Sequence, residues 1–159
     1  MPIYMKYDSV DGDATADGHA KWIQLNSCQW GVGRSITSPV GGSSDRESSA
    51  PSVSEVVVTK DTDSSSPKLF GEALEGEGQD CTIDFCKTDK GKLEVYLCLT
   101  LNNTLISGHS HSSGGDRPSE SLSLNFTKIE FKHIPTGEKA DTGSPESKSY
   151  DLAQAKVPS

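Results

Sequence analysis

The stretch LEVYLCLTL, residues 93–101, carries the strongest structural signal in the chain. Its odd-numbered positions are all aliphatic, whereas its even-numbered positions are polar or only weakly apolar. Strict alternation of this kind is typical of a half-buried β-strand. The preceding CTIDFCKTDKGK, residues 81–92, also alternates, and the residues Asp89, Lys90 and Gly91 near its end favour a turn. The two segments are therefore predicted to pair as an antiparallel hairpin.

Two other strand-like segments change face along their length. SESLSLNFTKIEFKHI, residues 119–134, is apolar at even positions up to Phe126 and at odd positions from Ile129 onward. AKWIQLNSCQWG, residues 20–31, changes phase after Leu25. Such a change requires a β-bulge or a strand that serves one surface and then another. The pattern predicts a curved sheet or barrel with apolar residues on both sides, one side facing the core and the other a neighbouring subunit.

One short helix is predicted, in SPKLFGEALEG at about residues 66–76. Ser66 is the expected N-cap, Pro67 suits the first helical turn, and Gly76 can end the helix. A helix this short is not stable alone, so it must pack on the sheet. Its apolar stripe consists of Leu69, Phe70, Ala73 and Leu74.

Two loop-like segments stand out between the predicted strands. RSITSPVGGSSDRESSAPS, residues 34–52, forms a long segment rich in Gly, Ser and Pro, and SGHSHSSGGDRPSE, residues 107–120, is rich in Ser, Gly and His. A loop longer than about 12–15 residues inside a compact domain is usually functional or disordered. The length of 159 residues indicates one domain, residues 1–159.

Composition excludes several classes of protein. The net charge is −8 and the basic residues are scattered singly, which argues against binding to nucleic acid. No segment has the roughly 20 consecutive apolar residues of a membrane span, so no membrane insertion is expected. The segment MPIYMKYDSVDGD, residues 1–13, lacks the features of a signal peptide, which predicts a protein made and folded in the cytoplasm.

Cysteine spacing gives no sign of a disulfide framework or a zinc site. The four cysteines contain no C-x-x-C pair, and we expect reduced thiols that act as small buried hydrophobic groups. These residues are Cys28, Cys81, Cys86 and Cys98.

A search for catalytic residues finds one candidate group. His109 and His111 form an H-x-H pair of the kind that can bind zinc or copper, but no spacing predicts the third ligand among Asp116, His133 and the cysteines. No serine stands at a nucleophile elbow. Asp61, Asp63 and Glu72 fit neither a calcium loop nor a clear acid–base pair, and turn or helix-start roles explain them better. We therefore predict a binding or structural protein rather than an enzyme, with no cofactor and no metal.

Four segments in order along the chain resemble the haemolysin-coregulated protein (Hcp) family of type VI secretion. They are HAKWIQLNSCQWG (19–31), VSEVVVTKDTDSSSPKLF (53–70), VYLCLTLNNTLIS (95–107) and ESLSLNFTKIEF (120–131). The most specific motif residues are Thr59, Lys60, Asp63, Ser66, Pro67, Leu69 and Glu120.

The resemblance implies a mainly β fold, a β-barrel-like pair of antiparallel sheets with one flanking helix. It also implies a homohexameric ring, stacking into a hollow tube inside a contractile sheath with a spike protein at the tip. The tube would be exported to target cells without a signal peptide and would carry small effector proteins in its lumen. A fused effector domain is not expected, because the chain ends about 25 residues after the last strong strand.

The resemblance and the face patterns together suggest three sets of site residues. The loop residues expected to contact the next ring are Gly41, Gly42, Asp45, Arg46 and Glu47. Ser27 and Gln29 are candidates for the lumen wall, and we expect Leu69, Phe70 and Leu74 to pack the helix onto the barrel. Two other functions stay open: a monomeric β-barrel carrier of a small ligand, and a metal-dependent enzyme that uses His109 and His111.

Overall fold

The computed structural model describes residues 1–38, 40–41, 47–136 and 143–158. Within these residues the chain is mainly β, with one helix, as the sequence predicted. The elements in chain order are β1 (Ile3–Tyr7), β2 (Ile23–Leu25), β3 (Ser27–Gln29), β4 (Val32–Gly33), β5 (Ile36–Thr37), β6 (Glu47–Ser48), β7 (Ser52–Val53), β8 (Val56–Asp61), α1 (Ser66–Glu75), β9 (Gln79–Asp89), β10 (Lys92–Ser112), β11 (Ser119–Asn125), β12 (Lys128–His133) and β13 (Glu146–Asp151).

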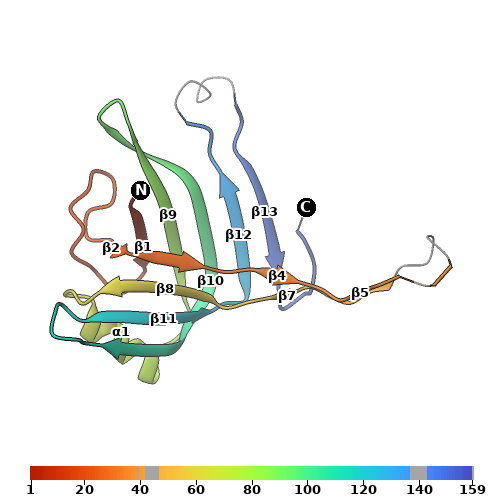
Figure 1. Ribbon diagram of the computed structural model, residues 1–159, viewed down its shortest axis with the longest axis horizontal. Coiled ribbons are helices and arrows are strands. Elements are labelled where there is room, and N and C mark those ends of the chain that lie inside the picture. The colour runs from red at the N-terminus through yellow and green to blue at the C-terminus, as the bar shows by residue number, and fades with distance from the viewer. Residues whose placement is uncertain (39, 42–46, 137–142, 159) are drawn as a thin grey trace.

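The main sheet is antiparallel and curls back on itself. Its strand order is β2-β1-β9-β10-β11-β8-β3, and β12 pairs with β10 and with β13. The first and last strands of this order, β2 and β3, are consecutive parts of one stretch of chain, residues 23–29. Figure 1 shows β9, β10, β12 and β13 running upright, with β8 and β11 lying across them. The architecture is therefore the barrel-like pair of sheets expected for this fold.

The hairpin predicted from the alternating pattern is confirmed. β9 and β10 pair in antiparallel register from Asp89↔Lys92 onward, joined by Lys90 and Gly91. These two residues have φ values of 49° and 78°, the left-handed conformation that a tight two-residue hairpin turn needs. β10 then continues for 21 residues, with register irregularities that let it pair with strands of both layers.

The two predicted changes of face mark places where the chain moves between the layers. Residues 119–134 divide at Phe126 and Thr127 into β11, which pairs with β8, and β12, which pairs with β13. Residues 23–29 divide in the same way at Asn26, whose backbone N–H donates to the Thr59 carbonyl at 2.7 Å. Each change of phase is thus a corner between strands rather than a bulge within one strand.

The core lies between the two layers and is aliphatic. Its fully buried side chains come from strands of both layers and from α1, and they include Met5, Ile23, Val56, Val58, Leu69, Ile83, Leu99, Leu101, Leu122 and Leu124. The four cysteines are free thiols, as the sequence suggested. Cys81 and Cys86 are fully buried, and Cys28 and Cys98 are half-buried. Burial raises the pKa of the Cys28 thiol to about 12, so this thiol stays protonated at neutral pH.

The helix differs from the prediction in two respects. Ser65, not Ser66, occupies the N-cap position, and it makes no side-chain capping bond. Of the apolar stripe only Leu69 is buried, at 0% exposure, whereas Phe70 is 53% and Leu74 is 70% exposed. The expectation that Phe70 and Leu74 pack the helix onto the barrel is wrong for the single chain. A ten-residue helix lying against β10 buries only the narrow part of its stripe that faces the strands.

The long segment at 34–52 is extended, and short ladders hold its two sides together. β4 pairs with β7 and β5 pairs with β6, and the resulting arm projects away from the main sheet (Figure 1). Of the predicted stacking residues, Gly41 is described, with a left-handed φ of 85°, and Glu47 begins β6. Gly42, Asp45 and Arg46 lie outside the described residues.

Candidate functional site

A buried ionic network brings together four of the motif residues. The Lys60 ammonium, 0% exposed, lies 2.8 Å from Glu120 Oε2 and 3.0 Å from Asp63 Oδ1. It also donates to Ser66 Oγ at 3.2 Å and to the Asp61 carbonyl at 2.9 Å. Isolated buried charges are strongly unfavourable, so this degree of pairing is what allows a lysine to lie in the interior.

Glu120 is the acceptor at the centre of this network. Its Oε2 accepts from Lys60 and, at 2.5 Å, from the Ser66 hydroxyl, while Oε1 lies 2.7 Å from His109 Nε2. Burial by itself would raise the pKa of this carboxyl. The hydrogen bonds from Lys60, Ser66 and His109, together with the charge of Lys60, outweigh burial and lower the pKa to about 2.

The network connects separate parts of the fold. Lys60 is on β8, Ser66 begins α1, Glu120 is on β11 and His109 is on β10. Ser66, predicted to cap the helix, instead binds Glu120 and accepts a hydrogen bond from the Asp63 backbone N–H at 3.0 Å. The motif therefore fixes the corner between β8 and α1 onto the sheet. Its role in the fold is structural.

Two other motif residues lie outside the network. Thr59 Oγ1 lies 2.5 Å from Ser27 Oγ at the surface, because alternation along β8 turns it away from Lys60. Pro67 is exposed in the first turn of α1. Leu69, in the first turns of the same helix, packs in the apolar core.

Acidification should weaken the network through Glu120. Because the folded-state pKa is lowered, its stabilising contribution is full above the ordinary value of 4.5 and is lost as the pH falls toward about 2. Lys60, Asp63, His109 and His111 are the charged or titratable groups around it. We expect the difference in unfolding free energy between the wild type and Glu120→Gln to shrink over this range in urea titrations. A difference independent of pH would contradict the assignment.

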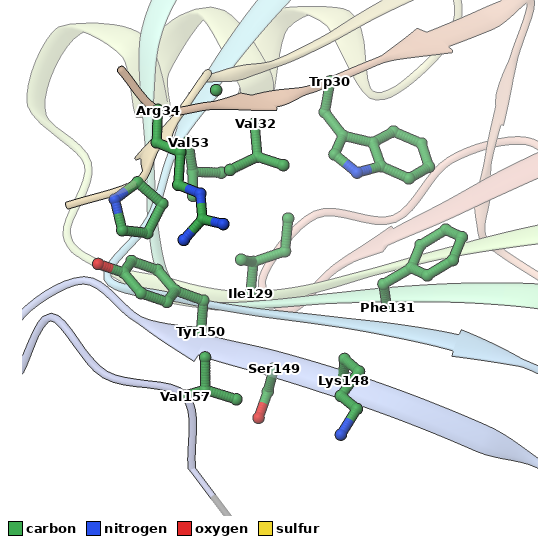
Figure 2. Close-up of a pocket in the computed structure, with 12 residues that line it drawn as sticks. Trp30, Val32, Arg34, Val53, Ile129, Phe131, Lys148, Ser149, Tyr150 and Val157 are labelled. Carbon is green, nitrogen blue, oxygen red and sulfur yellow. The ribbon is translucent and has the colours of Figure 1, made fainter. Parts of the chain in front are cut away.

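An apolar groove runs between the arm and the edge of the sheet. It has a volume of about 550 Å³. Figure 2 shows Trp30, Val32 and Val53 on one side of it, facing residues of β12 and β13 on the other. The Trp30 ring lies 5.5 Å from Phe131 and 5.9 Å from Phe85, measured between centroids. The apolar lining includes Trp30, Val32, Val53, Ile129, Phe131 and Tyr150.

The groove and the arm leave apolar side chains in contact with water. Val32 is 71%, Phe131 is 41% and Val157 is 61% exposed, and Ile36 farther along the arm is 45% exposed. Sequence reasoning anticipated a second apolar surface from the strands that change face but did not locate it. Contiguous exposure of this kind marks an interaction surface.

Ser27 and Gln29 lie together on the outer face of β3. Both are exposed, whereas Cys28 between them turns toward the core. They therefore share a solvent-facing side of the strand. Their place on the lumen wall of an assembled ring stays a prediction.

The predicted H-x-H pair lies on a strand rather than in a loop, because β10 extends to Ser112 and β11 begins at Ser119. Among the described residues, the group of potential ligand atoms around it includes none of the predicted third ligands, Asp116, His133 or a cysteine. Its acidic neighbour is Glu120. No helix in the described part of the chain is both long enough and apolar enough to span a membrane.

Comparison with known proteins agrees with the fold and with the family resemblance. The profile of a family described as "Type VI secretion system effector, Hcp" matches residues 4–133. A solved structure of a type six secretion system protein is 24% identical, covers 99% of both chains and superposes with a TM-score of 0.87. Among curated proteins no sequence matches.

Two further solved structures have the same fold. Hcp1 from Salmonella typhimurium is 20% identical over 99% of this chain and 98% of its own, with a TM-score of 0.76. A type VI secretion system effector from Yersinia pestis is 22% identical over 94% and 98%, with a TM-score of 0.74. The profile match spans most of the chain, and the family consists of structural secretion proteins rather than enzymes. The chain therefore belongs to the Hcp family of type VI secretion proteins.

Proposed function

We propose that six copies of this chain form a ring and that the rings stack into the hollow inner tube of a type VI secretion apparatus. The observation that carries the proposal is the apolar surface of the groove and arm, at which Val32, Phe131 and Val157 are exposed in the single chain. A neighbouring copy bound head to tail would cover this surface. Repetition of such a heterologous contact generates a closed ring when the rotation permits it.

The arm is well placed for contacts beyond the subunit that carries it. It projects from the sheet, and its two sides are joined by the short ladders β4–β7 and β5–β6. We propose that its tip, around Gly41, Gly42, Asp45, Arg46 and Glu47, contacts the next ring. Mixed charges at such a contact suit stacking that can be reversed.

The tube would act with other parts of the apparatus. A contractile sheath would surround it and a spike protein would lie at its tip. Small effector proteins would travel in the lumen, with Ser27 and Gln29 on its wall, and the subunit would be exported with them. Residues 1–159 would act as one tube-forming domain.

The mass of the purified protein in solution tests the ring. Six copies of the 17.0-kDa chain have a mass of about 102 kDa, which light scattering behind a sizing column measures directly. Negative-stain images should then show rings with a central hole. A stable monomer that binds a small apolar ligand in the groove would instead favour the carrier function.

A substitution on the arm should separate assembly from folding. Val32→Asp places a charge where the proposed neighbour packs, and because Val32 is 71% exposed the single chain should fold normally. We expect the 102-kDa species (six copies of 17.0 kDa) to be lost while the circular dichroism spectrum is unchanged. The control Val32→Ile keeps an apolar side chain and should preserve the ring. If the Val32→Asp variant forms rings as stable as those of the wild type, this surface is not part of the interface.

A further inference from the structure

His109, His111 and Glu120 project from the same face of the β10–β11 ribbon. Residues two apart on a strand share a face, which places both histidines on one side of β10. In the antiparallel register, His111 is paired directly with Glu120, and His109 is paired with Leu122. Cross-strand partners also share a face, so the carboxylate joins the two imidazoles. The third ligand that the sequence spacing could not supply comes from the opposite strand.

The side-chain atoms of this cluster are close to the arrangement that a metal ion requires. One ligand atom from each residue lies within 4.8 Å of the others, and His109 Nε2 is already 2.7 Å from Glu120 Oε1. Zinc binds imidazole nitrogen and carboxylate oxygen at about 2.0–2.2 Å, which puts neighbouring ligands roughly 3.3 Å apart. The His111 ring must therefore move inward by up to about 1.5 Å, and the His109–Glu120 pair must open slightly from 2.7 Å.

His111 can make this movement because it lies at the surface. Its ring is held by a 2.8 Å hydrogen bond between Nε2 and Thr62 Oγ1 and by edge contact with the His109 ring, at a centroid distance of 5.9 Å. Both contacts are weak compared with a metal bond. His109 and Glu120, in contrast, are packed in the interior, with side chains 7% and 0% exposed, and they need to separate by only about 0.6 Å to hold the ion.

The buried network prepares Glu120 to act as a ligand. Its Oε2 is held by Lys60 and Ser66, which leaves Oε1 directed at the histidines. The nearby ammonium of Lys60 opposes a second cation, but Asp63, 3.0 Å from Lys60 Nζ, offsets part of that charge. Groups that orient a ligand in this way commonly strengthen metal sites.

We propose that His109, His111 and Glu120 form a binding site for a divalent ion of the zinc class. Two imidazoles and one carboxylate suit zinc, and water would complete the coordination. Bound metal would connect β10 to β11 next to the turn at residues 113–118. The proposal concerns binding alone and does not depend on the ring.

Equilibrium dialysis of the tag-free protein against zinc sulfate at neutral pH tests the site. We expect one tightly held ion per chain, in whatever assembly the protein adopts. Cobalt(II) bound in place of zinc should give visible d–d absorption. His111→Gln should weaken zinc binding at least about tenfold and remove the absorption, while its exposed position leaves the fold intact.

The matched control is His133→Gln, which also removes one exposed histidine but on β12, away from the cluster. It should bind zinc as the wild type does. The proposal is overturned if the wild type holds no stoichiometric zinc, or if His111→Gln binds as tightly as the wild type. In either case the His109–Glu120 pair serves only to satisfy a buried carboxylate. Because binding is scored per chain, neither result bears on the ring.

Discussion

Replacing Lys60 by alanine is expected to lower the free energy of unfolding by about 3–5 kcal/mol. The ammonium group is fully buried and contacts Glu120 at 2.8 Å and Asp63 at 3.0 Å. Without it, the Glu120 carboxylate stays buried with only Ser66 and His109 as partners. An uncompensated buried charge is much less favourable than the intact pair. Urea denaturation at neutral pH and equal protein concentration measures the loss.

Two variants identify the origin of this loss. Lys68→Ala removes an exposed lysine from the neighbouring helix and should change stability by no more than about 0.5 kcal/mol. The double variant Lys60→Met with Glu120→Leu removes both charges and keeps side chains of similar volume. It should recover much of the loss, because apolar replacement of a buried pair is often neutral or stabilising. A loss below about 1 kcal/mol for Lys60→Ala would show that the pair contributes little.

The strands could be predicted because their signals are local. Alternation over residues 93–101 and the turn at Lys90-Gly91 specify a hairpin without reference to the rest of the chain. The changes of face near Asn26 and Thr127 also marked real corners. The distinction between a bulge and a corner depends on which strand lies alongside, which alternation does not encode.

The buried network could not be predicted from spacing. Lys60 and Glu120 are 60 positions apart, and their contact depends on the β8–β11 register, in which they are direct partners. Both residues were noted only as parts of a family motif, and a charged residue is usually expected at the surface. A second long-range register, between β10 and β11, brings Glu120 to the histidine pair. Long-range pairing is thus the common reason why both features were missed.

The helix shows the limit of periodicity in a short element. Leu69, Phe70 and Leu74 all belong to the apolar stripe, yet the single chain buries only the first. Periodicity gives the direction of the stripe around the helix axis, but the contact area is set by the surface beneath it. The exposed part of the stripe is free to meet another protein surface.

Leu69→Ala should therefore have a much larger effect than Phe70→Ala, although the two residues are adjacent. Leu69 is 0% exposed within the main core, and removing its side chain should destabilise the fold by about 2–5 kcal/mol, since a cavity remains. Phe70 is 53% exposed and contacts the His109 ring at 5.8 Å, so its removal should change stability by about 1 kcal/mol or less.

Thermal and urea unfolding of the two variants at the same protein concentration make this comparison. Equal losses would mean that Phe70 is buried in the folded protein as it exists in solution. If the loss for Phe70→Ala appears only in the assembled species, measured by light scattering before and after dilution, the exposed helix face belongs to a contact between subunits. If it appears at every concentration, the contact lies within one chain, and the orientation of α1 on β10 must differ from the one described.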